Sequence, residues 1–64
     1  MLFVKVHNPI VKADFLINVE QITSIHIKDC NIWLTDGGGQ LTLDAVSINK
    51  ILNILRTEGV LIDD

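Results

Sequence analysis

The sequence predicts an α+β fold, with a small antiparallel β-sheet of about five short strands, one C-terminal α-helix and a short β-prone tail. Two patterns lead to this expectation. Apolar and polar residues alternate with a period of two along much of the first 43 residues, which is typical of strands with one buried face. After Leu43 the apolar residues recur every three or four positions, which is the period of a helix. The length of 64 residues allows a single small domain.

The first two strands are expected over residues 2–7 and 10–17. Apolar side chains alternate with polar ones in the first run, and Asn8-Pro9 marks a turn before the second. The pattern then breaks at residues 18–21, which we interpret as a loop or a single helical turn.

Three further strands are expected over residues 22–28, 32–35 and 40–43, with a tight connection at residues 29–31. The last two are joined by Asp36-Gly37-Gly38-Gly39. This is a strong hairpin signal because glycine reaches positive φ freely.

The helix is expected over about residues 45–58, followed by a tail over residues 60–64. Asp44 can cap its first turn, and Gly59 can cap its end. The apolar stripe that defines the helix consists of Ile48, Ile51, Leu52 and Leu55.

The chain carries more aliphatic surface than one small core can bury. Ile, Leu and Val make up 24 of its 64 residues, whereas a domain of this size buries only roughly 60% of its unfolded surface. One helix covers one sheet face, which leaves Phe3 and Trp33 on the opposite face. Either a monomer has a slightly wide core, or copies of the chain bury these residues together. We expect a homo-oligomer because large exposed apolar patches are rare on monomers. The expected interface residues are Ile54, Val60, Leu61 and Ile62.

The charge pattern limits the partners. Five Lys and Arg residues face eight Asp and Glu residues, for a net charge of −3, and the basic residues form no run. Duplex nucleic acid requires clustered cations, so it is not expected as a partner, whereas one small anionic ligand needs only one or two cations. The apolar start is broken at Lys5 and His7, so neither a signal peptide nor a membrane span is expected. With a single cysteine, we expect a cytoplasmic location.

No residue set predicts catalysis. Ser24 and His26 share a strand face but point in parallel, so they do not form part of a triad. His7, His26 and Cys30 are the only soft metal ligands, and a zinc site usually needs four. The glycines at residues 36–39 lead into a strand, which favours a hairpin turn over a phosphate loop. We therefore expect no enzyme activity, no metal and no cofactor.

Trp33 is the only tryptophan and lies opposite Ile32 and Leu34 in its strand. It either packs in an interface or under the tail, or it stacks on a planar ligand or anchors a protein partner. For a nucleotide-like ligand, Trp33 or Phe3 would stack on the base, and a lysine would hold the phosphate. Exposed glycine N–H groups of the hairpin could also contact an anion bound between subunits. The residues predicted for ligand or partner binding are Trp33, Phe3, Lys5, Lys28, Gly37 and Gly38, with Lys12 as a further cation.

The segments 15–25 and 32–38 carry a recognisable pattern, a strand with an Asn-Val-x-x-Ile turn and then Ile-x-Leu-Thr-x-Gly. Between residue 15 and about residue 55, this resembles the FlbD-type family of small flagellar proteins and their uncharacterised bacterial and phage relatives. Asn18 and the turn from Thr35 to Gly38 match best. The family's Leu-Asn-Gly turn is replaced here by His-Asn-Pro, and the apolar tail is additional. The resemblance implies a small β-plus-helix fold and a regulatory role, and it carries over no catalytic residue.

Two function classes compete. The first is a non-enzymatic, homo-oligomeric regulatory or protein-binding module. The alternative is a viral-type sponge that sequesters a nucleotide-like signalling molecule in pockets between subunits; the likeness to very small viral proteins of this kind is in size and multimeric habit. A structural subunit of a larger assembly is a third possibility.

Overall fold

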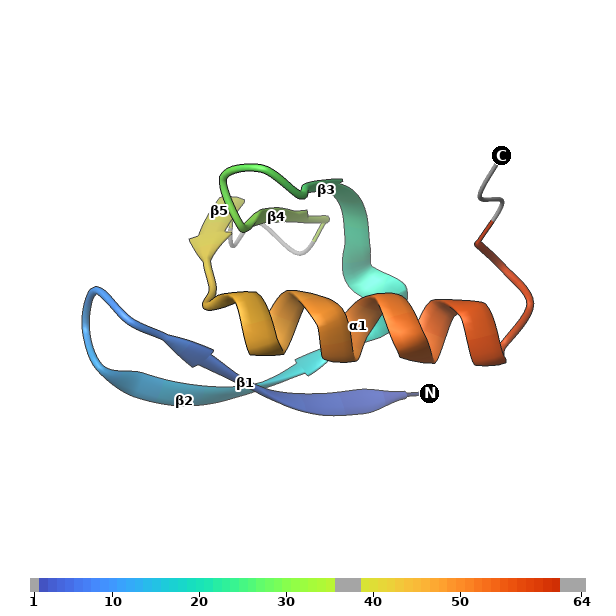
Figure 1. Ribbon diagram of the computed structural model, residues 1–64, viewed down its shortest axis with the longest axis horizontal. Coiled ribbons are helices and arrows are strands. Elements are labelled where there is room, and N and C mark those ends of the chain that lie inside the picture. The colour runs from blue at the N-terminus through green and yellow to red at the C-terminus, as the bar shows by residue number, and fades with distance from the viewer. Residues whose placement is uncertain (1, 36–38, 62–64) are drawn as a thin grey trace.

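The computed structural model describes residues 2–35 and 39–61, in which five strands precede one α-helix (Figure 1). The elements are β1 Phe3–Asn8, β2 Ala13–Asn18, the 3-10 helix η1 Val19–Gln21, β3 Ile22–His26, β4 Asn31–Leu34, β5 Gly39–Thr42 and α1 Ala45–Thr57. The expected α+β class is confirmed. The bounds of β4, β5 and α1 lie within one residue of the expected ones.

β1 and β2 form an antiparallel hairpin with continuous pairing. The second strand begins at Ala13 and not at Ile10, because the turn is longer than the sequence suggested. The side-chain oxygen of Asn8 accepts hydrogen bonds from the N–H groups of Ile10 and Val11, at 2.8 and 3.3 Å. Such bonds are typical of asparagine in turns, and they keep both apolar residues out of the strand.

The strands divide into two sheets, β1-β2 and β3-β4-β5, where the sequence suggested a single one. The break lies at η1, which is the helical turn allowed for residues 18–21. The side-chain oxygen of Asn18 accepts a hydrogen bond from the Glu20 N–H at 3.1 Å and caps this turn. The pairing of the hairpin ends with the bond from the Val19 N–H to the Leu2 carbonyl, at 2.8 Å. Because η1 then redirects the chain, β3 does not continue beside β1 or β2.

β3, β4 and β5 form an antiparallel meander. Ile25 pairs with Ile32 and Ile32 with Leu41, so these side chains share the face toward the core. Trp33 pairs with Gln40 and lies on the opposite face, as the alternation predicts.

The turns of the meander explain its shorter first strand. β3 ends at His26, two residues before the expected end, because residues 27–30 form a turn closed by a bond from the Cys30 N–H to the Ile27 carbonyl at 3.3 Å. In the second turn, Gly37 and Gly38 lie outside the described residues. Gly39 starts β5 with φ +67°, in the left-handed region that glycine adopts without strain.

α1 has the caps that the sequence predicts. The Asp44 carboxylate accepts a hydrogen bond from the Ser47 N–H at 2.8 Å. After the helix, Gly59 adopts φ +74°, and the Val60 N–H donates to the Leu55 carbonyl at 3.1 Å. This closure is a Schellman motif, which stops the helix.

A single core holds the three parts together, and α1 lies between the two sheets (Figure 1). The buried apolar residues are Val4, Val6, Ile17, Val19, Ile32, Leu43, Ile48 and Ile51. Because the inner faces of both sheets point toward α1, the outer faces, which carry Phe3 and Trp33, have no covering element in the described part of the chain.

Candidate interaction surfaces

The hairpin of β1 and β2 carries most of the exposed apolar side chains. Of the eight large hydrophobic residues exposed in the described ranges, five belong to this hairpin, and we call them the hairpin surface: Phe3, Ile10, Val11, Phe15 and Leu16. Leu16 is 72% exposed and Phe3 is 55% exposed, both on the face that points away from α1. Exposed apolar residues concentrated on one element are typical of an interaction surface.

A charge cluster lies beside Leu16 on the same face. The Asp14 carboxylate lies 3.6 Å from Lys5 Nζ and 2.8 Å from His7 Nδ1. The hydrogen bond with His7 is the main reason why the pKa of Asp14 lies below its ordinary value, and the attraction of Lys5 adds to it. The carboxylate of β2 therefore has two partners on β1, the Lys5 ammonium and the His7 ring.

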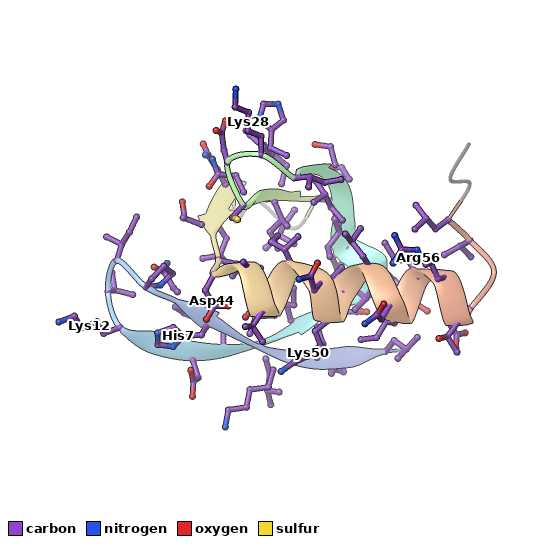
Figure 2. The ribbon with its side chains drawn as sticks, in the orientation of Figure 1. His7, Lys12, Lys28, Asp44, Lys50 and Arg56 are labelled. Atoms are coloured by element: carbon purple, nitrogen blue, oxygen red, sulfur yellow. The ribbon has the colours of Figure 1, made fainter. Side chains whose placement is uncertain are left out.

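The outer edge of β1 is bonded to the start of α1. The His7 N–H donates to the buried Ser47 hydroxyl at 2.9 Å, and the His7 carbonyl accepts from the Asp44 N–H at 3.1 Å. Lys50 Nζ donates to the Lys5 carbonyl at 3.0 Å (Figure 2). Hydrogen bonding by Ser47 holds the pKa of Asp44 below its ordinary value. The contribution of the Ser47 side chain is the larger one, and that of its backbone N–H is the next. This edge of the hairpin is therefore engaged within the chain.

A second apolar surface is a groove at the C-terminal end of α1, where the start of β1 also lies (Figure 1). We call it the C-terminal groove; it has a volume of about 320 Å³, and its apolar lining consists of Leu2, Val19, Ile22, Ile54, Leu55 and Val60. Leu61 lines an adjacent cavity. The structure thus brings Ile54, Val60 and Leu61 of the predicted interface to the same end of the molecule. Ile62 lies outside the described residues.

Trp33 lies half-buried on the outer face of the β3-β4-β5 sheet. The His26 ring meets it edge to face, with ring centroids 5.4 Å apart at 68°. His26 Nδ1 lies 3.2 Å from the Asp29 carboxylate, and the Thr23 hydroxyl donates to the Trp33 carbonyl at 3.2 Å. These contacts present an aromatic pair on an open sheet face, next to the turn that holds Lys28.

The residues predicted for a ligand do not converge within one chain. Phe3 and Lys5 lie on the outer face of the hairpin, and Trp33 lies on the outer face of the other sheet, with α1 between them. Lys28 lies above α1 and Lys12 lies beyond the N-terminal end of α1, so these two lysines extend from turns at separate places on the molecule (Figure 2). A site that used all of these residues would require more than one copy.

Residues 2–35 and 39–61 contain no group of three or more His, Cys, Asp and Glu side chains placed to hold a metal ion. Over the same ranges, no helix combines the length and the apolar character that crossing a bilayer requires.

Four members of the hairpin surface were missed as interface candidates from the sequence: Ile10, Val11, Phe15 and Leu16. A signal for Leu16 was present, because period-two alternation places it with Asp14, on the face opposite the aliphatic set. The exposure of Ile10 and Val11 follows from their bonds to the Asn8 side chain, which alternation does not reveal.

Comparisons with models of protein families, with curated proteins and with solved structures find no match. The likeness to FlbD-type proteins stays a prediction, and a functional proposal depends on the surfaces described above.

Proposed function

We propose that the chain is a non-enzymatic, homo-oligomeric regulatory or protein-binding module that self-associates through the hairpin surface. The observation that supports this proposal is the concentration of exposed apolar side chains on one hairpin. Fully burying one leucine or phenylalanine side chain is worth about 1.5–3 kcal/mol. Self-association that covers Phe3 and Leu16 of each copy therefore has a substantial driving force.

The C-terminal groove is a second place of contact between copies in this proposal. It collects Ile54 and Val60, and Leu61 lies beside it. The hairpin surface and the groove involve different elements, so variants can separate their contributions.

Sedimentation velocity and native mass spectrometry of the full chain, from nanomolar to micromolar concentration, test self-association. We expect a defined oligomer at micromolar concentration. Phe3→Ser on the hairpin surface and Ile54→Ser in the C-terminal groove should each weaken it, whereas the control Asn49→Ser, on an exposed position of α1, should not. A chain that remains monomeric at micromolar concentration contradicts the proposal.

The same mass spectra address the nucleotide-binding alternative. An oligomer that retains an additional mass of a few hundred daltons per site would favour the sponge, and the mass would indicate the ligand class. Trp33→Ala then separates the roles of the tryptophan: loss of the bound mass with an intact oligomer indicates stacking, and loss of the oligomer indicates packing.

A further inference from the structure

The outer edge of β2 carries backbone groups that no described residue satisfies. In an antiparallel pair, the N–H and C=O groups of one residue point to the same side. Those of His7 and the carbonyl of Lys5 point toward α1, so His7–Asp14, Lys5–Leu16 and Phe3–Asn18 are the non-hydrogen-bonded pairs of the hairpin. The N–H and C=O groups of Asp14 and Leu16 therefore point away from β1. Within residues 2–35 and 39–61, no backbone or side-chain partner bonds to them.

β2 also lacks the features that usually protect a strand edge. Natural sheets block their edges with lysine, proline, a bulge or a covering element. The six residues of β2, ADFLIN, include neither lysine nor proline, and they pair with β1 without a register shift. The one charge in the strand, on Asp14, is already paired with Lys5 and hydrogen-bonded to His7. Such an edge is a template for the addition of another strand.

We propose that a second copy of the chain adds to this edge, so that β2 pairs antiparallel with β2 of the partner about a two-fold axis at Leu16. This inference rests on the proposed self-association and names its geometry. In such a symmetric pair of strands, the residue on the two-fold axis lies opposite itself in the partner. The two copies of that residue can exchange hydrogen bonds if their N–H and C=O groups point away from β1, as those of Asp14 and Leu16 do. At Asp14 such an axis would place two carboxylates opposite each other, which is destabilising. At Leu16 it places Asp14 opposite the partner's Asn18, a neutral amide.

A symmetric register about Phe15 is less favourable. It places Asp14 opposite the partner's Leu16, and so a carboxylate beside an apolar side chain. The axis at Leu16 instead sets leucine against leucine on the outer face, and Phe15 against the partner's Ile17 on the inner face. Because apolar side chains meet apolar ones on both faces, this register is the better matched of the two.

The resulting dimer has one continuous four-stranded sheet with the order β1-β2-β2-β1. On its outer face the Leu16 side chains of the two copies lie side by side, and Leu16 is the most exposed apolar residue of that face, whereas Phe3 lies on the outer strand of each copy. Strand pairing and the burial of Leu16 therefore act at the same place.

A backbone variant tests the strand pairing directly. Leu16→Pro removes an outward N–H that the hairpin itself does not use, and proline is tolerated at edge positions of this kind. The matched control Leu16→Thr also removes the leucine side chain but keeps the N–H. By sedimentation velocity, we expect the dimer of Leu16→Pro to dissociate at least about tenfold more readily than that of Leu16→Thr. A folded Leu16→Pro protein that associates as tightly as Leu16→Thr overturns the proposal.

Disulfide trapping tests the register, and it does not depend on the folding of the proline variant. In a Cys30→Ser background, Leu16→Cys places two thiols at the axis, where Cα atoms lie about 5.5 Å apart, within disulfide range. Lys5→Cys is the control, because the two β1 strands lie three strand spacings apart, about 14 Å. Under mild oxidation at low protein concentration, the Leu16→Cys protein should form a covalent dimer and the Lys5→Cys protein should not. Equal rates of cross-linking overturn the register.

The outcomes separate this inference from the proposed function. A monomeric wild-type chain overturns both. An oligomeric wild type whose Leu16→Cys variant does not cross-link faster than the Lys5→Cys control overturns the register alone. If its Leu16→Pro variant also associates as tightly as Leu16→Thr, strand pairing is overturned too, and attention turns to the C-terminal groove.

Discussion

Ser47 joins the start of α1 to the edge of β1, and Ser47→Ala is expected to lower the free energy of unfolding by about 1–2 kcal/mol. Ser47 is only 3% exposed, and its hydroxyl accepts the His7 N–H at 2.9 Å. Alanine leaves the partly buried His7 N–H without a hydrogen-bond partner, which lowers the free energy of unfolding by about 1–3 kcal/mol. The higher helix propensity of alanine offsets about 0.5 kcal/mol of this loss.

The expected loss is large for so small a chain. At about 0.05–0.15 kcal/mol per residue, the total stability is roughly 3–10 kcal/mol. The melting temperature should therefore fall by about 4–16 °C. Thermal and urea unfolding followed by circular dichroism measure the effect, at one fixed protomer concentration because self-association makes stability concentration-dependent.

Asn49→Ala is the matched control, since Asn49 lies exposed in the same part of α1. It should leave stability unchanged or raise it by about 0.5 kcal/mol, through helix propensity alone. If Ser47→Ala unfolds at the same temperature and urea concentration as the wild type, the junction between α1 and β1 does not depend on the Ser47 hydroxyl.

Two further predictions concern acid and the helix end. Asp14 and Asp44 have pKa values lower in the folded chain than their ordinary value of 3.8, so their stabilising contribution is complete above the unfolded pKa and is lost as the pH falls through the folded one. The acid dependence of the unfolding free energy should be flatter in the double variant Asp14→Asn/Asp44→Asn, and an unchanged slope would contradict this assignment. Gly59→Ala should lower the free energy of unfolding by about 1 kcal/mol because Gly59 has φ +74°, in the left-handed region. Gly59→Asn should cost less because asparagine tolerates that region better than alanine. Equal melting temperatures of the two variants would contradict this prediction.

The local elements were accessible from the sequence because their causes are local. Asp44 and Gly59 cap α1 through bonds to residues within one or two helical turns. The position of Trp33 on an outer face follows from period-two alternation within one strand.

The candidate site was only partly accessible. Phe3 was expected on an uncovered face, and the structure places it on the outer face of the hairpin. The importance of Leu16 depends on which hairpin edge remains unbonded, and that edge is defined by contacts outside the hairpin. Alternation indicates the face of a side chain but not the neighbours of a strand.

The amino-acid pattern alone accounts for the number and order of the strands, for where the helix begins and ends, and for the faces of Phe3 and Trp33, because each depends on neighbours a few positions away. The division into two sheets and the open edge of β2 were decided only when the chain had folded. The bond from the His7 N–H to the Ser47 hydroxyl joins residues 40 positions apart and, with the Asp44 N–H, occupies the edge of β1. Contacts of such separation have no local periodic signature, so the surface on which the proposed assembly depends emerges from tertiary structure.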